Sequence, residues 1–167
     1  MTRALDLGCG LYPRNYFNAD QVLGVDIRSG LGHHVRTADL AIEPIPYESE
    51  SFDFVTAHDF LEHIPRLVYV PERRHAFVEL MSEIYRVLKL GGRFYSFTPA
   101  YPHSQVFQDP THVNFITQET FPFYFDDTNC WARDYGFKGA FRIVHQEWQQ
   151  ICLTTSMEKV PIPPAKN

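Results

Sequence analysis

Cysteine is scarce in this sequence, and the three cysteines that are present form no CxxC pair. Cys9, Cys130 and Cys152 lie far apart, so we expect neither a disulfide framework nor a zinc knuckle. Long apolar runs are also missing: none approaches the ~18 residues that cross a membrane, and the N-terminus lacks the pattern of a signal peptide. The sequence therefore predicts a cytoplasmic protein that does not associate with a membrane.

Positive charge is in the minority. The 15 Lys and Arg residues are outnumbered by 20 Asp and Glu residues, and the formal net charge is −5. Because proteins that bind nucleic acid usually carry a basic surface, nucleic acid is not expected as a partner. The 167 residues, 44% of them hydrophobic, are enough for one globular core. We expect a single domain over residues 1–160, followed by a loose tail at residues 161–167.

Short apolar runs that stop at polar, glycine or proline residues predict the strands of a buried sheet. The expected strands cover residues 3–7, 22–27, 33–40, 52–58, 93–102, 138–148 and 149–160. The third of these is the weakest, and the last two are expected to meet at a tight turn near Gln149. Between the first two strands, the segment from Pro13 to Asp20 is too short for a full helix, so a loop or a single helical turn is expected.

The strongest helical pattern covers residues 72–89. Apolar side chains recur there with the i, i+3, i+4, i+7 spacing of an amphipathic helix, at Phe77, Leu80, Met81, Ile84, Val87 and Leu88. Pro71 suits the start of this helix and Gly91-Gly92 its end, and a shorter helix is expected from Thr117. Strands that alternate with helices predict a doubly wound α/β domain, with a parallel sheet covered on both faces and a final antiparallel hairpin.

The turn after the first expected strand has the features of a ligand site. In the run Asp6-Leu7-Gly8-Cys9-Gly10, the two glycines allow a sharp bend and a close approach of the backbone to a ligand. Asp26 ends the next strand, roughly one strand spacing (~4.8 Å) away. A carboxylate in that place suits the two hydroxyls of a ribose. These residues predict a nucleoside-like ligand at the carboxyl edge of the sheet.

Five motifs occur in the order and spacing of a known family. They read ALDLGCG, GVDI, ADL, SFDFVTAHDFLEHI and EIYRVLKLGGRFYSFTP. Over residues 3 to about 100 the chain resembles the class I S-adenosylmethionine-dependent methyltransferases, and most of all their type 11 branch. The resemblance implies a Rossmann-like sheet of seven strands in the order 3-2-1-4-5-7-6, with the last strand antiparallel. It also implies S-adenosylmethionine as cofactor and methyl transfer as the reaction.

The resemblance assigns the family's cofactor-binding positions to Asp6, Gly8, Gly10, Asp26, Ile27, Asp39, Leu40 and His58. Asp6 and the two glycines correspond to the loop beneath the methionine part of the cofactor. Asp26 corresponds to the acid that binds the ribose, and Ile27 lies beside the adenine. Asp39 and the adjacent amide of Leu40 match the groups that bind the adenine amino group and a ring nitrogen. His58 takes the usual position near the methionyl portion.

The chain departs from its relatives at its beginning. Most relatives carry one or two helices before the first strand, and these often form a lid over the cofactor. Here only two residues precede the expected strand. The domain is therefore expected to be minimal at its N-terminus, and a homodimer or a partner chain is expected to cover the missing lid.

The segment after the fifth expected strand should face the acceptor, since it leaves the same carboxyl edge of the sheet. Its candidate residues are Tyr101, His103, Asp109, His112 and Asn114. Because histidine suits proton transfer near neutral pH, His112 is the first candidate for a base or substrate anchor and His103 the second. Tyr101, Asp109 and Asn114 are candidates for substrate binding. The run from Asp109 to His112 is equally compatible with an ordinary turn capped by Asp109.

A metal site is not expected, because His58, Asp59 and His63 lack the fuller ligand spacing of a zinc hydrolase. The leading interpretation is an enzyme that methylates a small-molecule or sugar-like acceptor. A non-catalytic binding or structural subunit with the same fold is the main alternative, favoured by the minimal N-terminus. A nicotinamide or nucleotide-sugar enzyme is the third, although the third glycine of a dinucleotide site is missing here, where Tyr12 and Pro13 follow the turn.

Overall fold

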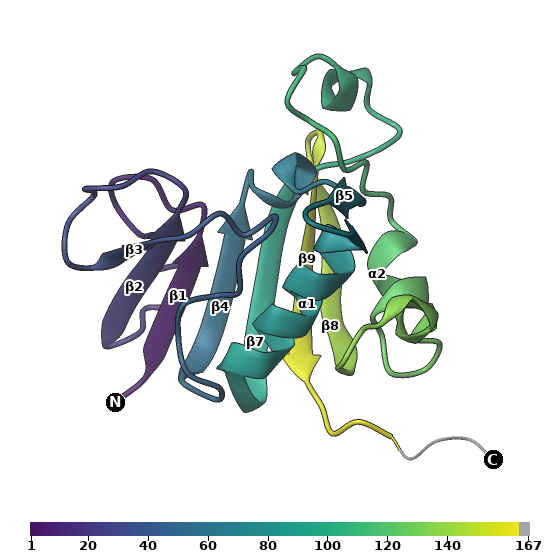
Figure 1. Cartoon of the computed structure of the whole chain (residues 1–167). Coiled ribbons are helices and arrows are strands. Elements are labelled where there is room, and N and C mark those ends of the chain that lie inside the picture. Colours follow the sequence, from purple (N-terminus) through teal and green to yellow (C-terminus); the bar gives the residue numbers. More distant parts are fainter. Residues whose placement is uncertain (164–167) are drawn as a thin grey trace.

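A seven-stranded sheet organises the computed structural model, which describes residues 1–163 (Figure 1). Its strands are β1 (Arg3–Leu7), β2 (Gln21–Asp26), β3 (Val35–Thr37), β4 (Phe52–His58), β7 (Leu88–Pro99), β8 (Phe141–Gln149) and β9 (Cys152–Lys159). They lie in the order β3-β2-β1-β4-β7-β9-β8, and β9 is antiparallel to both of its neighbours. Counted within this sheet, the order is 3-2-1-4-5-7-6, so the predicted topology and its antiparallel last strand are confirmed.

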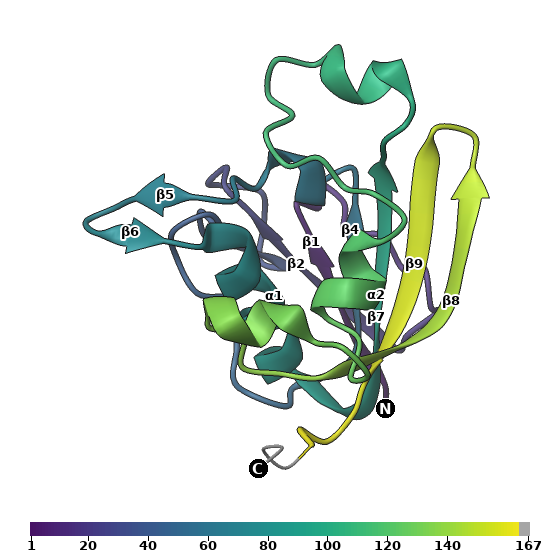
Figure 2. The ribbon, with the colours of Figure 1, turned by 90° about the vertical axis from the view of Figure 1, so that its right-hand side faces the viewer.

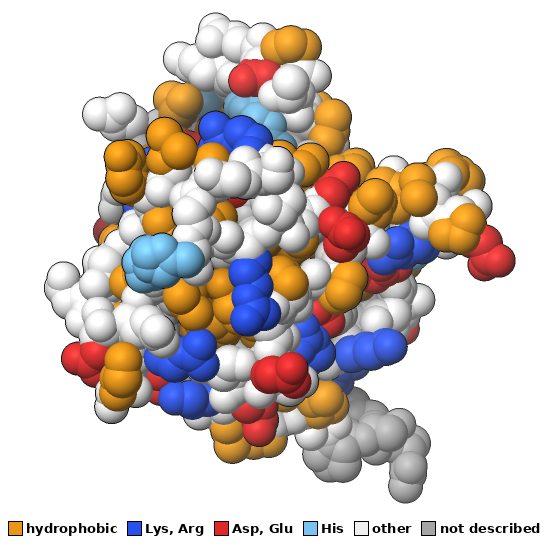
Figure 3. All heavy atoms as spheres, turned by 60° about the vertical axis from the view of Figure 1, so that its left-hand side comes forward, with side chains coloured by type: hydrophobic (Ala, Val, Ile, Leu, Met, Phe, Trp, Pro, Cys, Tyr) orange, Lys and Arg blue, Asp and Glu red, His pale blue; other side chains and the backbone are white. Residues whose placement is uncertain are grey.

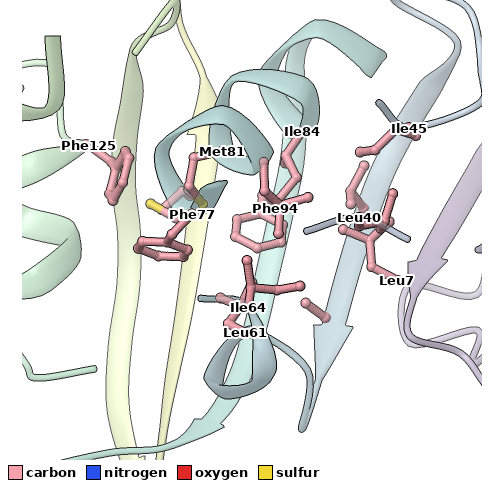
Figure 4. Close-up of a cluster of buried hydrophobic side chains, with 14 of the residues drawn as sticks. Leu7, Leu40, Ile45, Leu61, Ile64, Phe77, Met81, Ile84, Phe94 and Phe125 are labelled. Atoms are coloured by element: carbon pink, nitrogen blue, oxygen red, sulfur yellow. The ribbon is translucent and has the colours of Figure 1, made fainter. Parts of the chain in front are cut away.

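The hydrophobic core lies between the sheet and one long helix, α1 (Ala76–Val87). Strand residues alternate between the two faces, and the face that carries Leu7 and Phe94 packs against Met81 and Ile84 of the helix (Figure 4). The buried side of α1 is the one that its apolar spacing predicts. At the C-terminus, residues 161–163 carry no helix or strand, and the rest of the predicted tail, residues 164–167, lies outside the described residues.

The long helix begins later than predicted, at Ala76 instead of near Pro71. The preceding residues form a two-stranded hairpin, β5 (Val68–Tyr69) and β6 (Arg73–Arg74), which projects from the body of the molecule with hydrophobic side chains at its tip (Figures 2 and 3). Arg74 donates hydrogen bonds to Glu79 in the first turn of α1 and to the carbonyl of Ile42. These bonds hold Arg74 in the hairpin, whereas the helical pattern predicted that Arg74 belongs to the helix.

The other face of the sheet is covered by the connection between β1 and β2, which is a loop as predicted. Tyr16 stacks on Tyr95 with 4.1 Å between ring centroids, and Phe17 stacks on Phe54 at 4.4 Å. Tyr95 follows Phe94 in β7, so its side chain points away from α1. The helices of the described chain lie on the opposite side of the sheet (Figure 2). The sheet is thus covered on both faces, but an aromatic loop replaces the helix on one of them.

The chain after β7 rises above the carboxyl edge of the sheet before it returns to the helical side (Figures 1 and 2). It contains η2 (Ser104–Phe107), α2 (Thr120–Tyr124) and η3 (Trp131–Tyr135), and a further short turn, η1 (Leu61–His63), follows β4. The helix expected from Thr117 begins at Thr120, whose hydroxyl accepts the amide of Thr117. No helix in the described part of the chain is long and apolar enough to cross a membrane.

Candidate functional site

A cavity of about 310 Å³ opens at the carboxyl ends of β1 and β2. Gly8 and Asp26 line it from the ends of these strands, Asp39 from the connection after β3, and Asp59 and Phe60 from the connection after β4. β1 pairs with β2 on one side and with β4 on the other, so the strand order reverses here. Ligands of open α/β sheets bind at such a point, and the structure therefore has a cavity where the sequence predicts one.

Asp26 is held in place as a charged carboxylate at the wall of this cavity. Its Oδ2 accepts the amide of Gly10 at 2.8 Å, and its Oδ1 accepts the amide of Arg28 at 3.0 Å and the Arg28 Nε at 2.9 Å. The hydrogen bond from the Arg28 side chain lowers the pKa of the Asp26 carboxyl, which burial alone would raise. The Asp26 side chain is 6% exposed and that of Arg28 is 61% exposed, so the guanidinium can turn into solvent.

The residues that are predicted to bind the adenine line the same cavity. Asp39, Leu40 and Ile27 all line the cavity that contains Asp26. Asp39 Oδ1 accepts the amide of Ala41 at 3.0 Å, while the amide of Leu40 has no protein acceptor among the described residues. A carboxylate and a free N–H therefore lie next to each other on this wall.

The glycine turn is shaped by an aromatic ring. Gly8 has φ of +64°, and a Cβ atom on it would lie 2.4 Å from Cδ2 of Phe60. Both the backbone conformation and the ring therefore require glycine at this position. Gly10, also at φ +64°, presents its amide to Asp26.

Two of the predicted cofactor residues, Asp6 and His58, are not part of the cavity wall. Asp6 accepts the hydroxyl of Thr56 at 2.6 Å and the amide of Arg14 at 2.8 Å, so it fastens the loop that follows β1. His58 is on the same face as Thr56, two residues further along β4, and its ring is 5.4 Å from that of Tyr95. By the strand register Asp6, Thr56 and His58 share one face of the sheet, which is also the face of Asp26, and Asp6 Oδ1 lies 3.8 Å from Nδ1 of His58.

The predicted acceptor segment folds back onto the turn that follows β4. Thr111 binds Asp109 Oδ1 through its hydroxyl at 2.6 Å, and that hydroxyl is 3.1 Å from Nδ1 of His63. One side-chain atom each of Glu62, His63 and His112 lie within 4.8 Å of one another. His63 also lines the cavity. This cluster, Glu62-His63-His112, therefore borders the candidate cofactor site.

Glu62 is the most unusual member of the cluster, because its side chain is fully buried. Oε2 accepts the hydroxyl of Thr98 at 2.7 Å, whereas Oε1 has no hydrogen-bond partner within residues 1–163. Burial raises the pKa of the Glu62 carboxyl, against the hydrogen bonds that it accepts.

The remaining acceptor-side candidates are dispersed. Asn114 is fully buried, accepts Arg66 Nε at 2.9 Å and donates to the carbonyl of Leu61 at 3.0 Å, so its contacts make it a structural residue. Tyr101 is 55% exposed. The ring of His103 lies 5.2 Å from that of Trp148 in β8. His112 lies in the cluster with His63, Asp109 reaches it through Thr111, and Asp109 also caps its own turn by accepting the amide of Thr111.

Several cavity residues were not predicted. Arg28 follows the GVDI motif directly, and its charge beside an acid was a usable signal. Phe60 carried no such signal in the sequence, because it meets Gly8 only in the folded chain: Gly8 follows β1 and Phe60 follows β4, which are distant in sequence. Glu62 was visible only as part of the LEH motif, and its burial is a tertiary property.

The sequence comparison fits this geometry. A family model described as a methyltransferase domain, type 11, matches residues 5–96, more than half of the chain. The chain belongs to this methyltransferase family. The match includes β1, β2, β4 and most of β7, and with them the glycine turn, Asp26, Asp39 and the LEH turn. No curated protein matches the sequence of this methyltransferase.

Solved structures share the fold of this methyltransferase. A complex between the Trm112 methyltransferase activator and a methyltransferase from Haloferax volcanii contains a chain with a TM-score of 0.64 and 14% identity, over 96% of this chain and 83% of that one. An S-adenosylmethionine-dependent methyltransferase from Methanosarcina mazei has a TM-score of 0.60 and 18% identity, over 95% of this chain and 92% of that one. Another such methyltransferase, from Mesorhizobium loti, has a TM-score of 0.59 and 18% identity, over 94% of this chain and 90% of that one. At these identities the likeness shows the fold alone.

Proposed function

We propose that this methyltransferase binds S-adenosylmethionine in the cavity at the ends of β1 and β2 and transfers its methyl group to a small-molecule or sugar-like acceptor. The observation that carries the proposal is the shared cavity of Asp26 and Asp39. These acids end or follow consecutive strands, and both face one space beside the glycine turn. Their arrangement supports an adenosyl ligand, with a ribose diol at the first acid and an adenine at the second.

The residues present fit the cofactor at its nucleoside end. The volume of about 310 Å³ lies at the lower end of the range of small-molecule sites, roughly 300–1,000 Å³. The ribose hydroxyls would replace the Arg28 guanidinium on Asp26 Oδ1, and the exposure of Arg28 makes this exchange easy. Asp39 and the amide of Leu40 offer an acceptor and a donor to the adenine edge.

The chain's own contribution to the reaction is orientation. The cofactor supplies a methyl group on a positively charged sulfur, so the acceptor forms a bond to carbon as the carbon–sulfur bond breaks and sulfur keeps the electron pair. Alignment of such reactants can contribute roughly 7–11 kcal/mol. His63 lines the cavity and His112 lies in the same cluster, so these two imidazoles would take up the proton that a hydroxyl acceptor releases.

A partner chain remains part of the proposal. A structure with the same fold contains the Trm112 activator together with a methyltransferase. That assembly supports the idea that a second chain, either a different protein or another copy, covers the N-terminal side of the cofactor cavity here. The cytoplasmic location and the absence of nucleic acid among the partners stay predictions from the sequence.

Isothermal titration with S-adenosylmethionine and with its demethylated product tests the proposal. We expect binding by the wild type and at least tenfold weaker binding by Asp26→Ala and Asp39→Asn. The loss of one charge-assisted hydrogen bond costs about 1.5–3 kcal/mol, or about tenfold or more. Asp134→Ala, an acid on η3 away from the cavity, is the matched control and should bind as the wild type does.

The outcomes separate the proposal from its rival. If the folded wild type binds neither form of the cofactor, the non-catalytic alternative replaces the proposal. That alternative has support in the structure, because Phe60 packs on Gly8 and Arg28 occupies Asp26. A solved [4+2]-cyclase shares this fold with a TM-score of 0.55, so the fold alone does not specify methyl transfer.

A further inference from the structure

Glu62 carries a buried oxygen without a partner, and this requires an explanation. The side chain is fully buried, and Oε1 has no hydrogen-bond partner in the described chain. A buried carboxylate is costly unless it is paired, hydrogen-bonded or bound to a metal. The imidazoles of His63 and His112 belong to the same 4.8 Å cluster as Glu62, so all three side chains could bind one common partner.

His112 is oriented as a metal ligand is. Its Nδ1 lies 2.9 Å from the carbonyl oxygen of Val106, and a carbonyl only accepts, so Nδ1 carries the hydrogen. This fixes the tautomer and leaves Nε2 with a free lone pair. Histidines that bind metals usually donate their other ring N–H to a carbonyl or carboxylate in this way. His63 is likewise held on one side by Thr111.

We propose that Glu62, His63 and His112 bind a divalent transition-metal ion. Two imidazoles and one carboxylate are donors that suit Zn²⁺ or Fe²⁺, with at least one position left open. Bonds of about 2.0–2.2 Å would hold the donor atoms about 3–4 Å apart. Small side-chain movements close the cluster to that size. The sequence did not predict this site, because its ligands come from two segments about fifty residues apart in the chain.

The position of the ion would allow it to bind the acceptor. His63 belongs both to the cluster and to the wall of the candidate cofactor cavity. An ion at the cluster would therefore hold an oxygen of the acceptor beside that cavity, and this part of the inference rests on the proposed function. Because the ion would occupy the lone pairs of His63 and His112, it would replace these imidazoles as the group that assists the loss of the acceptor's proton. Asp109, whose Oδ2 is 3.9 Å from Nε2 of His112, adds negative charge on the open side.

Titration of the chelator-treated full chain with Zn²⁺ tests the site, and Co²⁺ absorption reports the ligands. We expect one ion per chain for the wild type. Glu62→Gln and His112→Asn should each weaken binding by tenfold or more, on the order expected for lost ligands. The asparagine amide can still donate to Val106, so His112→Asn removes the ligand nitrogen while it keeps the local hydrogen bond. His75→Asn, a histidine before α1, is the control that should bind as the wild type does.

Thermal unfolding of every variant without metal shows whether it is folded before it is compared. The inference is overturned if the wild type binds no ion, or if both folded ligand variants bind Zn²⁺ as tightly as the wild type. The titration contains no S-adenosylmethionine. A protein that binds Zn²⁺ but no cofactor would therefore keep this inference and lose the proposed function, and the reverse result would do the opposite.

Discussion

At Gly8, one missing side chain determines the shape of the cavity. The ring of Phe60 occupies the space of a Cβ, and the backbone has φ of +64°. The φ value alone is unfavourable for any other residue. The ring adds a steric conflict, and it links the end of β1 to the connection after β4.

Gly8→Ala should lower the free energy of unfolding by more than the cost of a positive φ alone, because the added methyl group would also meet the ring of Phe60. Gly30→Ala is the matched control, since Gly30 has φ of +77° and no atom within 4 Å of the added Cβ. We expect about 1–2 kcal/mol for Gly30→Ala and a larger loss for Gly8→Ala, measured by urea unfolding.

A double-mutant cycle isolates the ring. In the background of Phe60→Ala, the cost of Gly8→Ala should fall to that of Gly30→Ala. An unchanged cost would show that the ring does not restrict this position.

At this scale the predicted residues divide into those that line the cavity and those that do not. Asp26 and Asp39 could be placed because the ends of parallel strands meet at one edge, whatever the details of packing. Asp6 and His58 belong to the same motifs but are not part of the cavity wall, and they contact Thr56, Arg14 and each other. The sequence shows which strands carry them, but not which neighbours their side chains meet.

Among the elements, the loop between β1 and β2 does what a helix does in larger relatives. Tyr16 and Phe17 lie flat on Tyr95 and Phe54, and Asp6 holds the amide of Arg14. Stacked aromatic rings bury a large surface area although they belong to only a few residues. This is a physical reason why so short a connection can still cover a sheet.

Phe17→Ala should therefore destabilise the protein by about 1–3 kcal/mol, because it uncovers Phe54 and removes a stacked ring. Chemical denaturation measures the loss. Tyr12→Ala is the control in the same loop, since Tyr12 is 83% exposed, and it should change stability by less than about 0.5 kcal/mol. Equal effects of the two variants would mean that the loop does not cover the sheet in solution.

Across the whole molecule, partly buried carboxylates fasten the strands that carry or adjoin them to other parts of the chain. Asp53 accepts both the Lys89 ammonium at 2.9 Å and the amide of Arg3 at 2.8 Å. Asp126 accepts the hydroxyl of Thr128 at 2.6 Å and the amide of Ile143 at 2.9 Å. Burial acts to raise the pKa of each carboxyl, but these hydrogen bonds outweigh it, and both pKa values lie below the ordinary one.

The stability of the protein should fall in acid. A carboxyl with a lower pKa in the folded state binds fewer protons there than in the unfolded chain, so its contribution is present above the ordinary pKa of about 4 and is lost as the pH falls through the folded value. Urea unfolding at pH 7, 5, 4 and 3 measures this. Asp126→Asn should be less stable at pH 7 and should approach the wild type at low pH. A gap that stays constant with pH would contradict the assignment.

The sequence by itself predicted a doubly wound sheet, its family resemblance supplied the strand order, and its strand ends predicted which acids would meet at one edge. Apolar runs, strand ends and glycine turns are local features, and the parallel arrangement then brings Gly8, Asp26 and Asp39 to one edge. The hairpin before α1 escaped prediction because residues 72–75 fit a helical pattern, whereas in the structure they pair with β5 and Arg74 binds Glu79 and the carbonyl of Ile42.

Only the tertiary structure decided how the turn η1 (Leu61–His63) and the run from Asp109 to His112 lie together. Each is compatible with an ordinary turn, and neither predicts the other. Their contact brings the buried Glu62 together with His63 and His112 and places this cluster beside the cavity that His63 lines. Burial and juxtaposition depend on how the chain after β7 returns over the sheet, and a local pattern of residues does not contain that information.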